Sequence, residues 1–317
     1  MREEDYLKRF LHHKCSWMKL DCTEVRAITI QLGSSCPFNL DITLCCGQTF
    51  RWDKHGEWWY GVVGEEVCKI RQKCKTLEFE LVNASFVENY FRLHDDLPKI
   101  LSRINKDKNI KAAISEFRGL RILRQEPWEC LISYICATYK SISAIKRMLA
   151  DLSKRFGEEI CLNSHDFYTF PKPAELARAS VKELAACGLG YRAKYVSETA
   201  KLIYEDAFDL ERLKKTTYEK VKEELMNLPG VGPKVADCVL LFSLEKLEAF
   251  PVDVWIRRVI LKYYARHFPD EFVKKISAQE SLSSSEYEKL SSFGREYFGS
   301  YAGYAQEYLY HYERMQH

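Results

Sequence analysis

The stretch Leu228–Cys238, which reads LPGVGPKVADC, decides the fold of this 317-residue chain. Residues 220–226, just before it, have a helical composition, and Pro229 with the two glycines ends that helix. Pro233 then begins a second helix, because a proline in the first helical turn loses no hydrogen bond. The stretch therefore predicts two helices joined by a tight turn.

The glycines of this turn, Gly230 and Gly232, can bring backbone N–H groups close to a partner, beside the positive N-terminus of the second helix. Such a turn is suited to hold a phosphate of the DNA backbone without reading the base sequence. An ordinary helical hairpin with a glycine cap explains the turn equally well. The residues that follow have to decide between the two interpretations.

Lys234 lies in the first turn of the second helix, where the helix dipole disfavours an ammonium group and favours a neutral, nucleophilic amine. Cys238 follows four residues later and shares its helical face. Asp253 comes after Phe250–Val252 and precedes a predicted helix over residues 254–263, which is the position of an N-cap. A solvated lysine and a plain capping aspartate are the simpler interpretations, but a capping carboxylate is also a fixed negative charge.

Four further motifs accompany these residues in the chain: GQTFRW at 47–52, ECL at 129–131, GLGYRA at 188–193 and YAGYAQ at 301–306. With LPGVGPK and the downstream Pro-Val-Asp they resemble the helix-hairpin-helix, Gly/Pro-Asp DNA glycosylases. The resemblance is specifically to the 8-oxoguanine DNA glycosylase/AP lyase branch. It covers nearly the whole chain, with five motifs in the expected order, whereas a lone hairpin would be weak support.

The resemblance implies catalytic roles for two residues. Lys234 attacks C1′ of the damaged nucleoside and forms a Schiff base, after which β-elimination cuts the strand. Asp253 stabilises the positive charge that develops on the sugar. Asp237, three residues after Lys234, is a rival carboxylate, and a comparison of Asp237→Asn with Asp253→Asn would separate the two.

The resemblance also implies a set of base-binding residues. Gly47 offers its carbonyl to the N7–H that distinguishes 8-oxoguanine from guanine. Cys238 lies against one face of the flipped base, Gln306 binds its Watson–Crick edge, and Tyr310 stacks on it. Without the resemblance, Cys238 would be a small core residue and Tyr310 a packed helix residue.

Three more residues are expected to contact DNA: Tyr191 wedges into the gap left by the flipped base, Arg192 contacts the orphaned cytosine, and Trp255 lies near the flipped nucleotide's phosphate. The simpler interpretations of Tyr191 and Arg192 are a loop aromatic and a solvated arginine. Trp255 replaces a histidine of the best-known relatives. Residues 138–144, TYKSISA, replace an Asn-rich turn, so Tyr139 and Ala144 lack the contacts that select cytosine opposite the lesion.

Composition constrains the class of protein. Apolar residues make up 46% and charged residues 29%, and the net charge is 48 − 45 = +3, so a basic DNA-binding surface must come from the distribution of charge. The twelve cysteines are scattered without zinc-site spacings, and none follows Cys238, which excludes the iron–sulfur loop of a related branch. No metal site is predicted. Reduced thiols and no membrane association are expected of an intracellular protein, cytoplasmic with the nucleoid in a prokaryote or nuclear in a eukaryote.

The predicted fold class is α+β, with an N-terminal antiparallel β-sheet domain over residues 1–120 and a larger helical domain over residues 121–317. The predicted strands are 25–30, 48–52, 58–63, 67–71 and 77–81, and a capping box at Ser85 and Glu88 begins the covering helices. In the second domain, helices are predicted over 128–156 with a break at 138–141, over 191–204 and over 297–312, with loops at 166–173 and 281–292. The active site is expected in the cleft between the domains.

The function predicted from these features is base excision repair by a bifunctional DNA glycosylase and AP lyase. Its partner is double-stranded DNA containing 8-oxoguanine, bound by a monomer. No cofactor is required, although a monovalent cation can bind at the hairpin. The alternatives are a monofunctional glycosylase for another damaged base and a non-catalytic DNA-binding helix-hairpin-helix module. Lys234 and the GQTFRW motif argue against the first, and the second gives no reason for a lysine and an aspartate at these positions.

Overall fold

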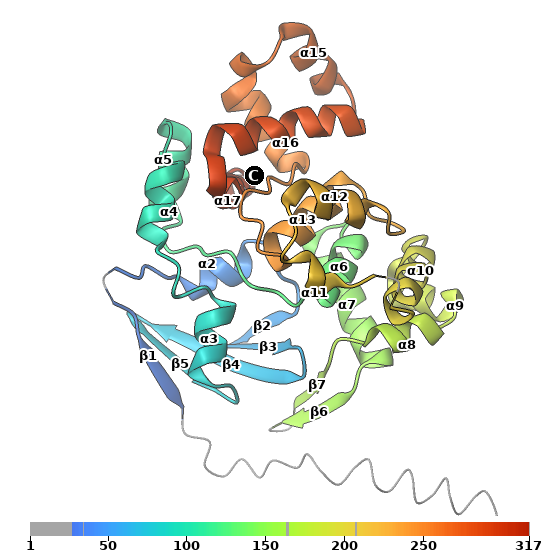
Figure 1. Ribbon diagram of the computed structural model, residues 1–317. Helices are drawn as coiled ribbons and strands as arrows, with labels where there is room; N and C mark the ends of the chain where they lie inside the picture. The colour runs from blue at the N-terminus through green and yellow to red at the C-terminus, as the bar shows by residue number, and fades with distance from the viewer. Residues whose placement is uncertain (1–26, 34, 163–164, 207, 317) are drawn as a thin grey trace, which may run out of the picture.

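The structure is a computed structural model that describes residues 27–33, 35–162, 165–206 and 208–316. An antiparallel sheet from the first quarter of the chain lies beside a larger set of helices, as Figure 1 shows. The α+β prediction is confirmed.

The sheet contains five strands in the order β1-β5-β4-β3-β2. Their bounds are β1 Ile28–Gln31, β2 Trp52–His55, β3 Trp58–Val63, β4 Glu66–Lys73 and β5 Thr76–Glu80. Trp59, Ile70 and Phe79 pair across neighbouring strands and are all buried on one face. This alternation of buried and exposed side chains fixes the register, because a slip of one residue would turn the whole apolar set to solvent.

Two short helices accompany the sheet: α2 (Leu40–Cys45), which was not predicted, and α3 (Ala84–Tyr90). The predicted strand at 48–52 is wrong, since only Trp52 belongs to a strand. The capping box at Ser85 is also wrong, because the side chain of Asn83 accepts the hydrogen bond from the Phe86 N–H (2.8 Å). Residues 25 and 26 of the first predicted strand lie outside the described residues.

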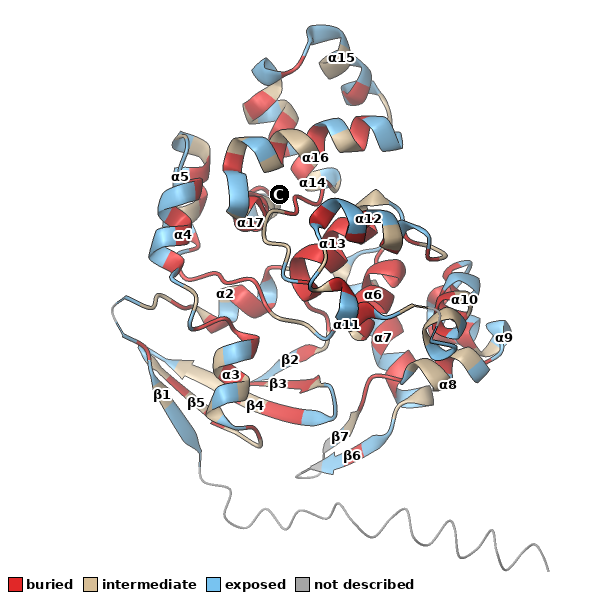
Figure 2. Ribbon diagram, viewed as in Figure 1, coloured by how far each residue is buried: buried red, intermediate tan, exposed pale blue. Residues whose placement is uncertain are grey.

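The helical part surrounds one almost wholly buried helix. Its helices are α4 (Leu97–Ile104), α5 (Lys108–Glu116), α6 (Pro127–Cys136), α7 (Ile142–Phe156), α8 (Pro173–Arg178), α9 (Val181–Leu184), α10 (Arg192–Tyr204), α11 (Leu210–Leu213), α12 (Tyr218–Met226), α13 (Pro233–Ser243), α14 (Val254–Val259), α15 (Asp270–Ala278), α16 (Ser284–Phe298) and α17 (Ala302–Met315). The buried helix is α13, in which residues 235–243 are all buried (Figure 2). The hairpin prediction is therefore confirmed, with α13 as the core of the helical part.

One of three further helical predictions is confirmed and two need correction. The break at 138–141 is confirmed between α6 and α7. The predicted loop at 281–292 is wrong, because Ser283 and Glu286 form a capping box that begins α16. The predicted final helix is interrupted at Gly299 (φ 74°), where α16 ends.

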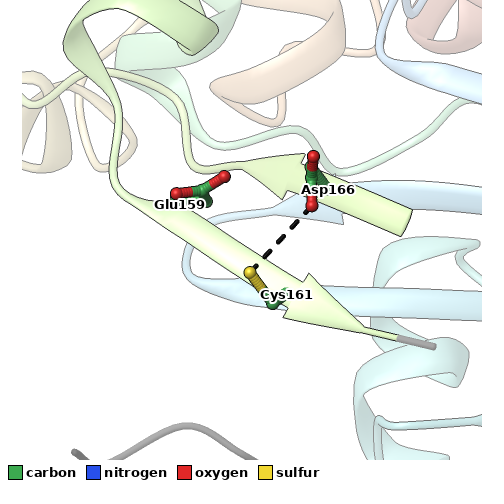
Figure 3. A group of neighbouring side chains, drawn as sticks. All are labelled: Glu159, Cys161 and Asp166. Carbon is green, nitrogen blue, oxygen red and sulfur yellow. Dashed lines mark hydrogen bonds between the residues drawn. The ribbon is translucent and has the colours of Figure 1, made fainter. Parts of the chain in front are cut away.

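The predicted loop at 166–173 also contains part of a strand. β6 (Glu159–Leu162) and β7 (His165–Tyr168) form a separate antiparallel hairpin. Glu159, Cys161 and Asp166 project from it together, as Figure 3 shows.

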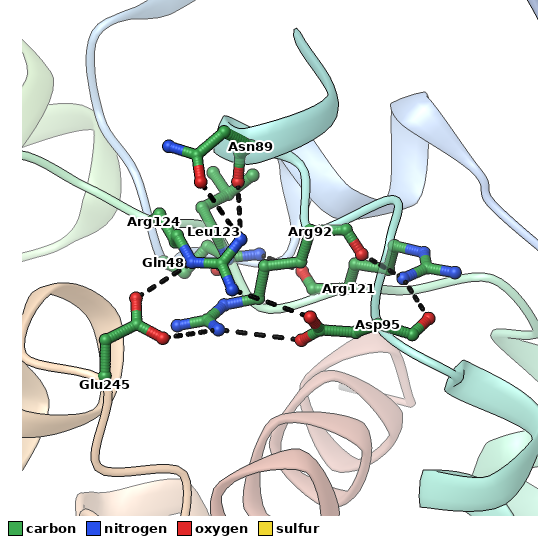
Figure 4. A network of polar contacts seen from close by, with 8 residues as sticks. All are labelled: Gln48, Asn89, Arg92, Asp95, Arg121, Leu123, Arg124 and Glu245. Atoms are coloured by element: carbon green, nitrogen blue, oxygen red, sulfur yellow. Dashed lines mark hydrogen bonds and ion pairs between the residues drawn. The ribbon is translucent and has the colours of Figure 1, made fainter. Parts of the chain in front are cut away.

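A network of arginines joins the two parts of the molecule (Figure 4). Arg92, fully buried after α3, forms an ion pair with Glu245 (2.8 Å), which follows α13 in the chain. Arg124 contacts the same carboxylate (2.9 Å). The helices α4 and α5 pack on α17, and their side chains belong to the same apolar cluster as the helical part. The boundary at residue 120 stays a prediction.

Candidate active site

A cavity of about 750 Å³ opens between the loop after α2, the α6–α7 turn and the helices α13, α14 and α17. This volume is in the range of small-molecule sites. Seven of the predicted site residues line it: Gly47, Lys234, Cys238, Asp253, Trp255, Gln306 and Tyr310. These seven residues come from four of the five elements, namely the loop after α2 and the helices α13, α14 and α17 with their caps.

Lys234 occupies the first turn of α13, after Gly232 as N-cap and Pro233 at N1. Gly232 brings no side chain to the helix N-terminus, so the positive end of the dipole is not neutralised there. The Lys234 ammonium lies 5.0 Å from the centroid of the Tyr134 ring. Among the described residues it forms no hydrogen bond or ion pair. A lysine half-buried in this way is available for reaction at the cavity wall.

Asp253 caps α14, and one of its oxygens accepts hydrogen bonds from the N–H groups of Trp255 (3.0 Å) and Ile256 (2.8 Å). Burial raises the pKa of this carboxyl, and the Ile256 hydrogen bond and the charge of Lys234 oppose the increase. The N-cap interpretation is confirmed. The same carboxylate also lines the cavity, so the structural role leaves it facing the space where a ligand would lie.

Gly47 has a φ of +106°, a conformation that side chains rarely adopt. A Cβ at this position would lie 3.0 Å from Nη1 of Arg314 and 3.2 Å from the hydroxyl of Tyr310. Within the described part of the chain, the Gly47 carbonyl accepts no hydrogen bond. Only a glycine fits this place, and it leaves a free acceptor beside the cavity.

Gln48 fixes the Gly47 loop from behind. Its side chain donates to the carbonyl of Arg121 (2.8 Å) and accepts from the N–H of Leu123 (2.8 Å), as Figure 4 shows. Its backbone carbonyl accepts from Gln125 Nε2 (2.6 Å) and the Tyr134 hydroxyl (3.2 Å). These bonds replace the strand pairing that the prediction assigned here, and Tyr134 connects the loop to Lys234.

The other three base-binding candidates surround the same space. Cys238 is buried one helical turn after Lys234, and burial raises the pKa of its thiol to about 12, so it presents a neutral sulfur. Gln306 on α17 is buried and its Oε1 has no hydrogen-bond partner among the described groups. Tyr310 follows one turn later on α17 and lies next to Gly47. An unpaired amide and an apolar wall are what a bound base edge and a base face would require.

Comparison with known proteins places the chain in a family. Residues 30–131 match the model of the 8-oxoguanine DNA glycosylase N-terminal domain, and residues 132–279 match that of HhH-GPD superfamily base excision DNA repair proteins. A probable N-glycosylase/DNA lyase of Methanothermobacter thermautotrophicus is 34% identical over 249 residues, which cover 72% of this chain and 74% of that relative. The chain belongs to the 8-oxoguanine DNA glycosylase family.

Two further comparisons agree with this family. An N-glycosylase/DNA lyase of Arabidopsis thaliana is 31% identical over 299 residues, covering 86% of this chain and 76% of the relative. The crystal structure of Clostridium acetobutylicum 8-oxoguanine glycosylase/lyase, in complex with double-stranded DNA containing cytosine opposite 8-oxoguanine, has a TM-score of 0.81. It is 30% identical and covers 92% of this chain and 97% of its own. The sheet and the helical part thus follow the fold of the family.

In the present chain, Asp237 does not line the cavity. It is fully buried and accepts hydrogen bonds from the hydroxyls of Tyr218 (2.6 Å) and Tyr287 (2.6 Å) and from Lys222 Nζ (3.1 Å). Both carboxylate oxygens of Asp237 therefore accept hydrogen bonds from other side chains of the protein. Asp237 therefore has a structural environment, whereas Asp253 faces the cavity.

Glu307, next to Gln306 on α17, is a cavity residue that the sequence analysis did not predict. Its side chain is 2% exposed, it lines the cavity, and its Oε1 has no partner among the described residues. Burial raises its pKa to about 7. The YAGYAQ motif ends just before it, and a glutamate in a helix gives no sequence signal of burial.

Of the residues expected to contact the DNA backbone or the opposite base, Trp255 lines the cavity, while Tyr191, Arg192, Gly230 and Gly232 lie outside it. Tyr191 is 59% exposed, and Gly230 (φ +80°) and Gly232 form the accessible turn before α13. Gly232 has an extended backbone, so only Gly230 uses a positive φ. Arg192 is only 3% exposed and donates to the carbonyls of Thr138 and Leu189 (3.4 Å). In this structure its guanidinium points into the protein, and its contact with cytosine stays a prediction.

Among the described residues of this family member, one group has a spacing that could hold a metal ion, and it lies outside the cavity. The ligand atoms of Glu159, Cys161 and Asp166 lie within 4.8 Å of one another on β6 and β7 (Figure 3), but all three residues are exposed. Exposed acidic groups of this kind are common without a metal. Among all the residues that the structure describes, no helix is long and apolar enough to span a membrane.

Proposed function

We propose that this chain flips 8-oxoguanine out of duplex DNA, excises it through a Schiff base on Lys234, and then cuts the strand by β-elimination. The observation that carries the proposal is one cavity that is lined by Lys234, Asp253 and Gly47 together with the unpaired Gln306. The names of the relatives, N-glycosylase/DNA lyase and 8-oxoguanine glycosylase/lyase, support both activities.

The first chemical step follows from the position of Lys234. In its neutral form, the lone pair of Nζ attacks C1′ while the bond from C1′ to the base nitrogen breaks, and that electron pair leaves with the base, which takes up a proton. Asp253 stabilises the positive charge on the sugar in this transition state, as a fixed and partly desolvated carboxylate. Deprotonation of the attached nitrogen and opening of the sugar ring give the Schiff base.

The lyase step uses the same covalent link. The imine acidifies the C2′ proton, and its removal expels the 3′ phosphate as the C3′–O bond breaks. Water then hydrolyses the imine and frees Lys234. The base, the cut strand and the enzyme are separate products, and no electron donor or acceptor is required.

Gly47 supplies the selection between lesion and normal base. 8-Oxoguanine has an N7–H that can donate to the free Gly47 carbonyl, while guanine would bring a lone pair against it. A buried acceptor left without its donor costs about 1–3 kcal/mol, so this one contact supplies roughly 10- to 100-fold discrimination. The neutral thiol of Cys238 and the ring of Tyr310 would bind the base faces, and Gln306 its Watson–Crick edge.

The proposed partner is duplex DNA, which one copy of the protein binds. The expected compartment is the one that contains the genome, which is the cytoplasm with the nucleoid in a prokaryote or the nucleus in a eukaryote. The turn at Gly230 and Gly232 would hold a backbone phosphate, with Trp255 beside the flipped nucleotide. Arg258 lies 4.9 Å from the centroid of the Trp255 ring and adds positive charge at this edge. Binding should weaken as salt rises, because phosphate contacts release counterions. In a sedimentation experiment, a single complex that contains one protein and one duplex would support binding by a monomer.

A monovalent cation at the hairpin stays part of the proposal. The carbonyls of Leu228 and Pro229 accept hydrogen bonds from the Val231 N–H (3.1 Å) and the Thr199 hydroxyl (3.0 Å), and each keeps a second lone pair. Backbone carbonyls of this kind suit a monovalent ion. The ion would only fix the turn for a phosphate, and no step of the reaction needs it.

Borohydride trapping tests the proposal directly. A duplex with one 8-oxoguanine and an undamaged duplex are each incubated with wild type, Lys234→Gln and Lys220→Gln, a control that removes the same charge from an exposed position on α12. We expect a covalent adduct with wild type and Lys220→Gln on the damaged duplex alone. An adduct that persists in Lys234→Gln would assign the nucleophile to another residue. Base release without any adduct would mean a monofunctional enzyme. If neither an adduct nor base release were observed, 8-oxoguanine would be excluded as the substrate.

A further inference from the structure

Glu307, on α17, is a buried acid that the proposed reaction does not use. Its side chain lines the active-site cavity and is 2% exposed, and its Oε1 has no hydrogen-bond partner among the described residues. Native proteins rarely leave a buried polar atom without a partner, because such an atom has lost its hydrogen bonds to water. An unpaired oxygen at the wall of a cavity is therefore a candidate contact for the molecule that fills the cavity.

The surroundings of Glu307 favour the protonated form of its carboxyl. Burial raises its pKa to about 7, the contact with the Cys46 thiol and the charge of Arg314 oppose the increase, and the charge of Asp253 adds to it. The guanidinium of Arg314 donates to the carbonyl of Cys45 (2.7 Å) and is engaged there. The Cys46 thiol is neutral, because burial raises its pKa well above the ordinary value. A carboxyl in this place changes its charge near neutral pH.

Three other ionisable groups around Glu307 keep one charge state near neutral pH. They are Tyr134 on α6, Cys238 on α13 and Tyr310 on α17. Burial raises the pKa of each, so all three stay neutral from pH 6 to pH 8. Burial also raises the pKa of Asp253, the N-cap of α14, so a test of Glu307 has to compare proteins that share this aspartate.

The neighbours of Glu307 indicate which part of a bound base it faces. Gln306 precedes it on α17 and lines the same cavity, and Cys46, which it contacts, precedes Gly47 in the chain. In the proposed complex, Gly47 accepts from N7–H of the flipped base and Gln306 binds the Watson–Crick edge, which includes N1. The purine atoms between N7 and N1 are C5 and C6, and C6 carries the oxygen O6. A side chain between the Gly47 loop and Gln306 therefore lies beside O6.

We propose that Glu307, in its protonated form, donates a hydrogen bond to O6 of the flipped 8-oxoguanine and so determines which oxidised purine the enzyme accepts. The inference rests on the proposed function, which places the base in this cavity. O6 only accepts hydrogen bonds, and an ionised carboxylate would bring lone pairs against it. 8-Oxoadenine has the same N7–H but an amino group at C6, which would donate to an ionised Glu307. The charge of one side chain therefore sets the choice between two oxidised purines.

The first test measures base release from a duplex with 8-oxoguanine at pH 6, 7 and 8 by wild type, Glu307→Gln, Glu307→Leu and Glu223→Gln, the last at an exposed position on α12. A glutamine amide can donate at every pH, whereas leucine cannot donate. With a pKa of about 7, the protonated fraction of Glu307 falls about 10-fold from pH 6 to pH 8. The ratio of the wild-type rate to the Glu307→Gln rate should fall by the same factor. The ratio to Glu223→Gln should stay constant, and the titration of Lys234 cancels in both ratios.

Cleavage of a preformed abasic site is the control for folding and for the chemistry of Lys234, because no base is present. Its rate ratios should not change with pH. Glu307→Leu should release 8-oxoguanine about 10-fold more slowly than Glu307→Gln at every pH, while it cleaves the abasic site at the same rate. Equal base release by these two variants would assign Glu307 a purely structural role and overturn the inference. A constant ratio of wild type to Glu307→Gln would also overturn it.

The second test assigns the contact to O6. Dissociation constants for duplexes with 8-oxoguanine and with 8-oxoadenine are measured at pH 6 and pH 8 in a Lys234→Gln background, which does not react. The preference should move from 8-oxoguanine toward 8-oxoadenine by at least about 10-fold as the pH rises, and adding Glu307→Gln should remove this change. A preference that is independent of pH would contradict the contact with O6. Failure of the proposed function looks different: wild type would release no 8-oxoguanine at any pH, while the binding preference would still test Glu307.

Discussion

Replacing Glu307 with glutamine is expected to stabilise the protein, and by more at pH 8 than at pH 5. Glu307 is 2% exposed with an unpartnered oxygen, and burial raises its pKa from the ordinary value of 4.5 to about 7. The Cys46 contact and Arg314 oppose the increase, while Asp253 adds to it. Burial raises the pKa of Tyr134, Cys238 and Tyr310, and the charge of Glu307 adds to the increase.

The sign follows from proton binding. Between pH 4.5 and pH 7 the unfolded chain releases the Glu307 proton while the native protein keeps it, so stability falls as the pH rises through this window. The difference between 4.5 and about 7, at about 1.4 kcal/mol per pH unit, corresponds to a full penalty of about 3 kcal/mol. Roughly 1 kcal/mol of it is already present at pH 5, where the unfolded glutamate is mostly ionised. The penalty should therefore grow by about 2 kcal/mol from pH 5 to pH 8.

The assay is urea denaturation of wild type and Glu307→Gln at pH 5, 6, 7 and 8. An amide does not titrate, so the packing effect of the substitution is the same at each pH and cancels in the comparison. Glu223→Gln, at an exposed position on α12, is the matched control and should show no such trend. If the free-energy difference between wild type and Glu307→Gln is the same at pH 5 and pH 8, the reasoning from burial is refuted.

Four further substitutions separate structural from chemical roles. Asp237→Asn should cost roughly 3 kcal/mol of stability, because it breaks a buried charge pair, and the folded fraction should still form the borohydride adduct. Asp253→Asn should instead stay folded and lose base release; the reverse pattern would exchange the two roles. Gly47→Ala brings a methyl group to 3.0 Å from Arg314, so excision of 8-oxoguanine should fall at least about 10-fold while cleavage of a preformed abasic site persists. Gly230→Ala should weaken binding of damaged and undamaged duplexes alike by about 10-fold in fluorescence anisotropy, and an effect on damaged DNA alone would contradict a phosphate contact.

Sequence patterns predicted the regular elements where one face is buried. The alternation through Trp59, Ile70 and Phe79 placed strands correctly, because a half-buried sheet repeats every two residues. The pattern failed at residues 48–51, where the backbone is satisfied by side chains such as Gln125 rather than by a neighbouring strand. It failed again at α16, where a polar, serine-rich composition hid a helix that packs through a narrow apolar stripe.

The motifs predicted much of the site membership, since seven of the named residues line one cavity. They could not predict that Glu307 belongs there. A side chain's burial depends on which distant elements cover it, and Glu307 is covered partly by the loop at Cys46, far away in sequence. Local composition contains no record of that contact.

By itself, the sequence determined the two helices of the hairpin, the turn at Gly230, the first-turn position of Lys234 and the N-cap at Asp253. These features depend on interactions within a few residues, which the order of residues fixes directly. Only the tertiary structure decided that Asp253 faces the cavity while Asp237 does not. Asp237 is held by Tyr218 and Tyr287, from two other helices, and that choice depends on how distant elements pack.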